Sequence, residues 1–149
     1  MTLAQLINVA ALVLACAIAF WRGREPERLG VSIVAIGFIV TPIVERRENW
    51  LQPQYGILAV DVMILAALVV MAFRYDRYWT VCAAAFQTVA VLTHFAFLIR
   101  PGALYRAYYF ANFAIGFLIL GTVVGGVLIE RGAPYRRRRP LSPGPPSTP

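Results

Sequence analysis

The sequence contains no lysine, one histidine, two cysteines and only seven acidic residues among its 149 positions. Because His94 is the single histidine, one chain cannot supply haem with two histidine ligands or build a multi-histidine metal site. Cys16 and Cys82 lie inside hydrophobic segments without metal-ligand spacing, so we expect neither a disulfide framework nor a zinc site. No glycine-rich phosphate loop, nucleophile beside a base, or pair of carboxylates at catalytic spacing occurs. The sequence therefore predicts no cofactor and no metal, and it gives no positive sign of an enzyme.

The chain as a whole is rich in apolar residues and poor in charged ones. Hydrophobic residues make up 60% of the chain and charged residues 14%, whereas a soluble domain is roughly 45–50% apolar and about 25% charged. The length fits one domain, and the excess apolar surface belongs in a lipid bilayer. The net charge of +7 is typical of nucleic-acid binders. Here, however, the arginines are distributed between hydrophobic segments, which is the pattern of membrane topology, so we expect no nucleic-acid partner.

Five apolar segments can be read along the chain: 3–21, 29–44, 56–73, 78–99 and 108–129. A helix needs about 20 apolar residues, with a working range of 17–25, to cross the hydrocarbon core. Four segments fit this range. The segment 29–44 is a little short. It can still span with local thinning of the bilayer, because Arg28 and Glu45 at its ends can extend their side chains to the membrane borders; a re-entrant or interfacial segment is the alternative. The sequence thus predicts an all-α polytopic transmembrane bundle of five helices, with four as the variant.

The arginines predict the orientation, because basic loop residues favour the cytoplasmic side of a membrane. With five spans, ten of the fourteen arginines fall on one side. These are Arg22, Arg24, Arg28, Arg74, Arg77, Arg131, Arg136, Arg137, Arg138 and Arg139. If 29–44 did not span, the arginines would divide evenly. The bias predicts five spans with the N-terminus outside and the C-terminus in the cytoplasm.

The C-terminal residues 132–149 differ in character from the transmembrane domain 1–131. This tail is rich in proline and polar residues and cannot bury a core, so we expect a disordered cytoplasmic tail. Just beyond the last span it carries a run of four basic residues: Arg136, Arg137, Arg138 and Arg139. Basic residues at this place contact anionic lipids. The run is therefore interpreted as a topology anchor on anionic lipids, with docking of a partner as the alternative.

Aromatic and small residues carry two further expectations. Tyrosines and tryptophans near the segment ends are typical of a membrane-interface belt: Trp21, Trp50, Tyr55, Tyr75, Tyr78, Trp79, Tyr105, Tyr108 and Tyr109. Helices approach closely in membranes where residues are small. Gly121, Gly125 and Gly126 in the last segment, and Ala11, Ala15 and Ala19 in the first, predict helix packing within the chain, with homo-oligomerisation as the alternative.

Six polar residues lie inside the apolar segments: Asp61, His94, Gln87, Asn112, Asn8 and Gln5. Ionisable groups are costly inside a membrane and suggest a functional site. Asp61 lies about six residues after the outer start of its helix and His94 about six residues before the outer end of the next. Both should therefore lie about 9 Å below the outer border. We expect a polar cluster that opens to the outside, with Asp61 close to His94. The alternative is that these residues are only tolerated near the interface or bond between helices.

Two stretches carry a family resemblance. Trp21–Arg28, and Asp76–Trp79 continuing through Gln87 to Thr93–His94, resemble a group of uncharacterised small polytopic inner-membrane proteins of GC-rich alphaproteobacteria. The resemblance covers most of the hydrophobic body and not the tail. It implies a multi-pass location in a bacterial inner membrane and no particular activity.

Three functions are consistent with these features. The first is an accessory or scaffolding component of a membrane complex, whose partners are the bilayer and other membrane proteins. The second is a small transporter or proton-coupled carrier that uses the cluster around Asp61 and His94. The third is a membrane-embedded enzyme acting on lipid or quinone, for which a lone aspartate and histidine offer little catalytic equipment.

Overall fold

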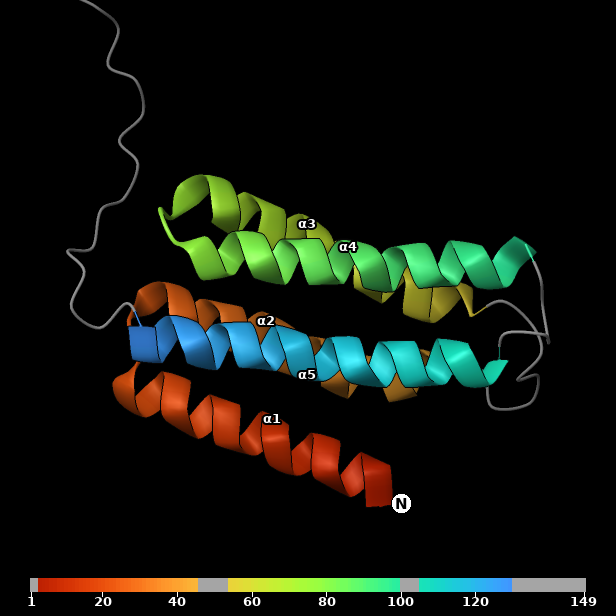
Figure 1. Ribbon diagram of the computed structural model, residues 1–149, viewed down its shortest axis with the longest axis horizontal. Helices are drawn as coiled ribbons and strands as arrows, with labels where there is room; N and C mark the ends of the chain where they lie inside the picture. Colours follow the sequence, from red (N-terminus) through yellow and green to blue (C-terminus); the bar gives the residue numbers. More distant parts are fainter. Residues whose placement is uncertain (1–2, 46–53, 100–104, 130–149) are drawn as a thin grey trace, which may run out of the picture.

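The computed structural model describes residues 3–45, 54–99 and 105–129. These residues form five helices: α1 (Leu3–Arg22), α2 (Glu25–Val44), α3 (Tyr55–Arg74), α4 (Tyr78–Ile99) and α5 (Tyr105–Ile129). The helices run up and down in alternation along the long axis of the molecule (Figure 1). The predicted fold class, an all-α bundle of five helices, is confirmed.

By length and composition, four of these helices can cross a membrane. The qualifying stretches are Glu25–Val44, Tyr55–Arg74, Tyr78–Ala96 and Phe110–Ile129. Helix α1 has 20 residues in all, and among its described side chains Leu6–Arg22 form a further apolar stretch. The molecule therefore has the make-up of a multi-pass membrane protein.

Helix α2 is longer than the predicted segment 29–44, because it begins four residues earlier at Glu25. Pro26 occupies the first turn, where its missing N–H is not needed. The side chain of Glu27 accepts a hydrogen bond from the backbone N–H of Arg24 at 2.8 Å, which satisfies a donor at the helix start. These polar residues add a full turn, so the 20-residue helix is long enough to span without the thinning that the shorter segment required.

Two very short connections hold consecutive helices together at the same end of the bundle. Gly23 joins α1 to α2 and donates its backbone N–H to the carbonyl of Ala19 at 2.9 Å. A Cβ at Gly23 would collide with that carbonyl oxygen, so the tight turn requires glycine. Between α3 and α4, the side chain of Thr80 donates to the carbonyl of Arg77 at 2.7 Å. These turns force α1 with α2, and α3 with α4, into antiparallel pairs.

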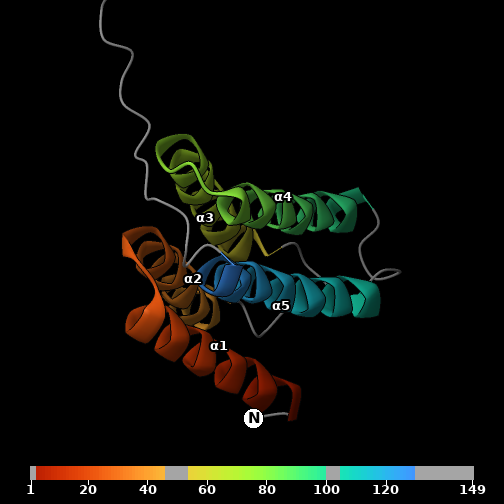
Figure 2. The ribbon, with the colours of Figure 1, turned by 60° about the vertical axis from the view of Figure 1, so that its left-hand side comes forward.

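The packing order makes α5 the central helix. Each helix contacts the next one in sequence, and α5 also contacts α1 and α2. The turned view in Figure 2 shows α5 between α4 and α1. Small residues fill much of the interior, among them Ala15, Ala19 and Ala83, which are at most 2% exposed. The predicted packing role of Ala15 and Ala19 is therefore confirmed, and Ala11 packs against the same core.

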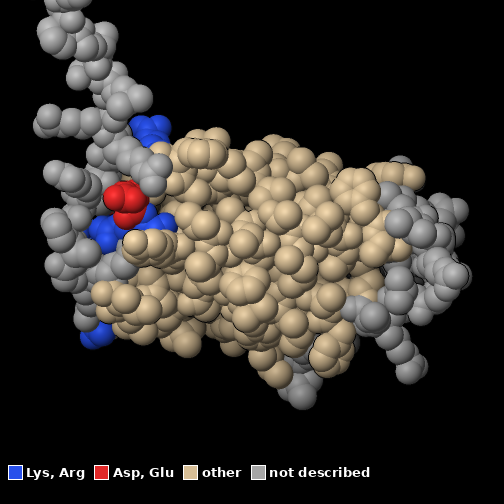
Figure 3. All heavy atoms as spheres, turned by 45° about the horizontal axis from the view of Figure 1, so that its top comes forward, with Lys and Arg blue, Asp and Glu red and all other residues tan. Residues whose placement is uncertain are grey.

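The outer surface of the bundle is apolar along most of its length. Large hydrophobic side chains such as Leu14, Ile39, Val70, Leu92 and Leu128 point outward and are more than half exposed. On the face shown in Figure 3, charged side chains gather at one end, and the described surface beyond them carries none. A soluble protein does not expose so large an apolar area, whereas a bilayer covers it.

Several expectations concern positions outside the described residues. The tail 132–149 and Trp50 belong to these positions. So do the four arginines expected to contact anionic lipids or a partner, Arg136, Arg137, Arg138 and Arg139. The side chains of Gln5, Tyr105 and Tyr109 are likewise not described, although their backbones belong to helices. For all these residues the sequence-based predictions stay predictions.

Candidate functional site

Four polar side chains from three helices form one hydrogen-bonded network. Asp61 lies in the second turn of α3, Gln87 and His94 lie in α4, and Tyr108 lies near the start of α5. Oδ2 of Asp61 is 2.8 Å from Nε2 of His94, and Nε2 of Gln87 donates to Oδ1 of Asp61 at 3.0 Å. Both carboxylate oxygens of Asp61 are therefore bonded to α4.

The helical repeat of α4 places the side chain of Gln87 on the same side of the helix as that of His94. Gln87 lies seven residues before His94, which is almost two turns, so both side chains leave α4 on the same face. Both are buried, at 3% and 5% exposure. The Gln87 amide also lies 3.2 Å from the backbone oxygen of Asp61, which matches its two N–H donors to two acceptors. This double contact fixes the register of α3 against α4.

Tyr108 extends the network to α5. Its hydroxyl oxygen lies 3.1 Å from Nδ1 of His94 and 3.4 Å from Nε2. The two rings meet edge to face, with centroids 5.2 Å apart. His94 is thus held between a carboxylate on one helix and a phenol on another.

The geometry admits two protonation states of His94 with the same partners. A neutral His94 with its proton on Nε2 donates to the ionised Asp61 and accepts the Tyr108 O–H at Nδ1. A protonated His94 donates from both nitrogens, and the Tyr108 oxygen becomes the acceptor. The network can therefore gain or lose one proton without losing its hydrogen bonds.

Asp61 is the member of the pair that is nearer to the surface of the bundle. Its side chain is 16% exposed, against 5% for His94. The Asp61 carboxyl group is therefore the more accessible end of this hydrogen-bonded pair. The arrangement suits proton binding and transfer.

The other polar residues expected in this cluster lie differently. Asn112 donates its side-chain N–H to the backbone carbonyl of Tyr108 at 3.1 Å, within its own helix. Asn8 lies on α1, which packs against α2 and α5, and its side-chain oxygen is buried without a hydrogen-bond partner among the described residues. The structure thus brings together Asp61, Gln87 and His94, and it does not bring Asn8 into their network.

Tyr108 was missed as a member of this network because sequence reasoning assigned it to the interface belt. Its phenol is half-buried and faces His94 instead of the bilayer border. The sequence did offer one signal, the matched position along the bundle. Tyr108 lies near the start of its helix, at the same end of the bundle as the end of the helix that carries His94. That position alone does not tell which way a side chain points.

The expected interface belt divides into outward and inward members. Trp21, Tyr55 and Tyr78 are exposed, as a belt requires. Tyr75 and Trp79 also stand at helix ends but are buried, at 3% and 4% exposure, so the belt interpretation is wrong for these two. Both point inward because acidic acceptors on α2 hold their polar atoms.

Two glutamates at the start of α2 provide these acceptors. The Tyr75 hydroxyl donates to Oε1 of Glu25 at 3.1 Å, and Nε1 of Trp79 donates to Oε1 of Glu27 at 3.2 Å. Glu27 is itself only 3% exposed. Glu25 and Glu27 had no predicted role of their own, because nothing in their spacing pairs α2 with the start of α4.

The three glycines of α5 that were expected to pack, Gly121, Gly125 and Gly126, have different surroundings. A Cβ at Gly126 would collide with the ring of Trp79, so this position has the close packing expected of it. At Gly121 and Gly125 no described atom lies within 4 Å of such a Cβ. The expected packing within the chain therefore applies to Gly126, whereas Gly121 and Gly125 face open space in the described structure.

Metal-ligating residues do not gather among the described residues: no three His, Cys, Asp or Glu side chains come close enough there to hold a metal ion. Comparison of the chain with protein-family models, with curated proteins and with solved structures yields no match.

Proposed function

We propose that this chain is a small proton-coupled membrane carrier in which Asp61 and His94 form the proton-binding pair. The observation that carries the proposal is the 2.8 Å contact between the Asp61 carboxylate and the His94 imidazole in the apolar part of the bundle. Ionisable residues are rare in membrane spans because their burial is costly, and they mark ion and proton pathways.

Stability alone is a weak reason to keep such a pair. Replacing a buried ion pair with packed apolar residues is often neutral or stabilising. A chain that needed only contact between α3 and α4 would be served by the alanines and valines that fill the rest of its core. The pair, its Gln87 support and its Tyr108 contact are therefore better explained by proton binding.

Protonation supplies a physical route from the pair to the movement of a cargo. A proton on Asp61 removes the charge that holds His94 and Gln87. Because these bonds join α3 to α4, neutralising Asp61 replaces charge-assisted hydrogen bonds between the two helices with weaker neutral ones. A carrier needs such a link between proton binding and helix arrangement.

The test uses the full chain in sealed vesicles with a pH-sensitive dye inside and an imposed membrane potential. We expect proton uptake by the wild type, and uptake no faster than in protein-free vesicles for Asp61→Asn. Asparagine retains the fold because its oxygen accepts from Gln87 and its N–H donates to His94 in the other tautomer. The matched control is Asp76→Asn, an exposed carboxylate of the α3–α4 turn. Equal uptake by wild type and Asp61→Asn, or none by either, would count against the carrier.

The accessory role is the second candidate, and one observation favours it. Gly121 and Gly125 lie on a face of α5 where a Cβ at either position would meet no described atom within 4 Å. Small residues on such a face let a further helix approach closely. Such a protein would assemble with other membrane proteins, and the arginine run 136–139 would add contact with anionic lipids. It would co-purify with a stable partner in mild detergent, whereas a carrier works alone.

Location and orientation belong to the same proposal. The arginine distribution supports an N-terminus outside and a C-terminus in the cytoplasm, which places the Asp61 network in the outer half of the membrane. The resemblance of Trp21–Arg28 and of the Asp76–His94 region supports a bacterial inner membrane.

A further inference from the structure

A cavity of about 230 Å³ lies at the end of the bundle opposite to the Asp61 network. It is bordered by the α1–α2 turn, the beginning of α2, the turn before α4 and the last turn of α5. Its lining residues are Arg22, Gly23, Arg24, Glu27, Arg77, Gly126 and Val127. The volume is several times the roughly 30 Å³ share of one water molecule, so the cavity has room for a tetrahedral oxyanion.

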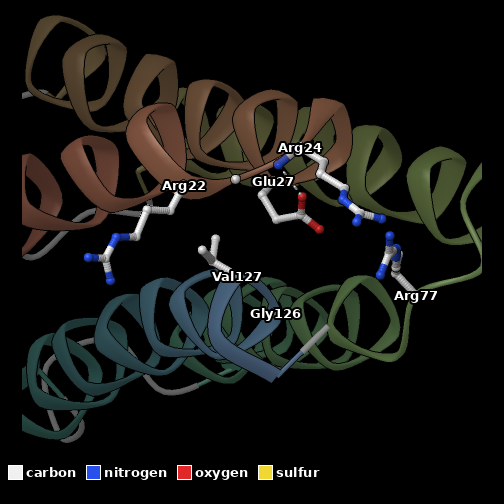
Figure 4. A pocket seen from close by; sticks show the side chains of 7 residues that line it. Arg22, Arg24, Glu27, Arg77, Gly126 and Val127 are labelled. Carbon is white, nitrogen blue, oxygen red and sulfur yellow. Dashed lines mark hydrogen bonds between the residues drawn. The ribbon is translucent and has the colours of Figure 1, made fainter. Parts of the chain in front are cut away.

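Positive charge dominates the lining, with three arginines against one glutamate. Figure 4 shows the side chains of Arg24 and Arg77 extending toward each other on one side of the cavity, while Arg22 lies on the other side. The guanidinium groups of Arg24, from the α1–α2 turn, and of Arg77, from the turn before α4, thus come together here (Figure 4), although like charges repel at short range. Planar guanidinium forks match the oxygens of a phosphate group.

Both carboxylate oxygens of Glu27 accept hydrogen bonds from the protein itself. One carboxylate oxygen of Glu27 accepts from the Trp79 indole at 3.2 Å, and the other accepts from the backbone N–H of Arg24 at 2.8 Å. These bonds hold the carboxylate in place at the start of α2. Glu27 thus offsets only part of the positive charge of the three arginines that line the cavity.

The position of the cavity matches the level of lipid headgroups. Figure 3 shows the charged side chains at one end of an otherwise uncharged described face. Val127 and Gly126 form the apolar side of the cavity, next to the exposed Leu128 and Ile129. A phosphate held by the arginines would thus stand where the apolar surface begins.

We propose that this cavity is an anion site that binds a phosphate group, as carried by an anionic lipid headgroup or by free phosphate. The site is separate from the proton-binding pair. Along α5, Gly126 and Tyr108 are 18 residues apart, which corresponds to about 27 Å at 1.5 Å per residue. A test of anion binding at this cavity is therefore independent of a test of the carrier proposal.

The test measures binding to the full chain in a nonionic detergent with three probes: inorganic phosphate, dihexanoyl phosphatidylglycerol and zwitterionic dihexanoyl phosphatidylcholine. The variant is Arg24→Gln, whose exposed side chain can change without opening the core. The matched control is Arg28→Gln, which makes the same change one turn later on α2, is also exposed and does not line the cavity.

We expect Arg24→Gln to raise the dissociation constant for the phosphate-bearing probe by about tenfold or more, because it removes a charged hydrogen-bond donor. Arg28→Gln should change it by much less, and added salt should weaken binding to the wild type. Tighter binding of phosphatidylglycerol than of phosphate assigns the site to a lipid headgroup, and the reverse assigns it to free phosphate. No binding of either probe, equal binding of phosphatidylcholine, or equal losses in the two variants would overturn the proposal.

Discussion

At the scale of single residues, Trp79 connects three helices at the charged end of the bundle. Its indole N–H donates to Glu27 on α2, and its ring occupies the space that side chains at Gly30 on α2 and Gly126 on α5 would need. The ring is 4% exposed. One side chain from α4 therefore fixes the spacing of α2 and α5.

This role predicts a clear loss of stability for Trp79→Phe. The smaller ring leaves a void between the two glycines, and Glu27 loses its buried donor, which alone costs about 1–3 kcal/mol. We expect a lower midpoint of thermal unfolding, followed by helical circular dichroism in mild detergent. The control Tyr78→Phe alters a neighbouring side chain that is 88% exposed, and it should shift the free energy of unfolding by less than about 0.5 kcal/mol. Equal midpoints for the two variants would contradict the spacing role of Trp79.

At the scale of elements, α5 has one side that faces the bundle and one that faces outward, although apolar residues occur on both. It contacts α1, α2 and α4, and buried positions such as Ile119, Val123 and Val127 follow one another at helical spacing. Gly126 belongs to this buried side, whereas Gly121 does not. The same residue type thus has two different roles within a short stretch of one helix.

Alanine at these two glycines should have opposite effects. Gly126→Ala places a Cβ against Trp79, and overpacking of this kind costs about 1–3 kcal/mol. Gly121→Ala meets no described atom and gains about 0.5–1 kcal/mol from reduced backbone entropy in the unfolded chain. Thermal midpoints of the two variants in the same detergent measure the difference. A loss for Gly121→Ala as large as that for Gly126→Ala would show that this face packs against another helix, as the accessory role requires.

At the scale of the whole molecule, the five alternating helices bring two kinds of polar chemistry to opposite ends. The Asp61 network lies toward the end where α4 finishes and α5 begins. The arginine cavity lies at the end of the two short turns. Apolar side chains cover the outside between them, as a bilayer requires.

This arrangement, together with the arginine bias, predicts which loops face the cytoplasm. A reporter that is active only outside the cytoplasm should be active when fused after Gln52 or Gly102. It should be silent after Asp76 or at Pro149, because the loops richest in arginine stay inside. Measured reporter activities, normalised to the amount of fusion protein, give the topology. Activity at Pro149 would reverse the proposed orientation.

The sequence by itself determined the helices and their approximate ends. Long apolar runs bounded by charged and aromatic residues allow only helices in a bilayer, because backbone groups must be satisfied within each segment. Four of the five helices were therefore located to within three residues at either end. The exception is α2. Its first turn, Glu25–Arg28, is polar and is stabilised by its cap, so hydrophobicity did not reveal that it is helical. Matched depth likewise pointed to Asp61 and His94.

Only the tertiary structure decided which way each helix face turns. Helices α3, α4 and α5 are apolar on every side, so hydrophobic periodicity does not set their rotation about the helix axis. That rotation turned Tyr108 toward His94, Trp79 toward Glu27, and Gly121 away from its neighbours. It also gathered the arginines of the α1–α2 turn and of the turn before α4, which are far apart in the sequence, around one cavity. Such contacts arise from how side chains of different helices fit together, and no single helix contains that information.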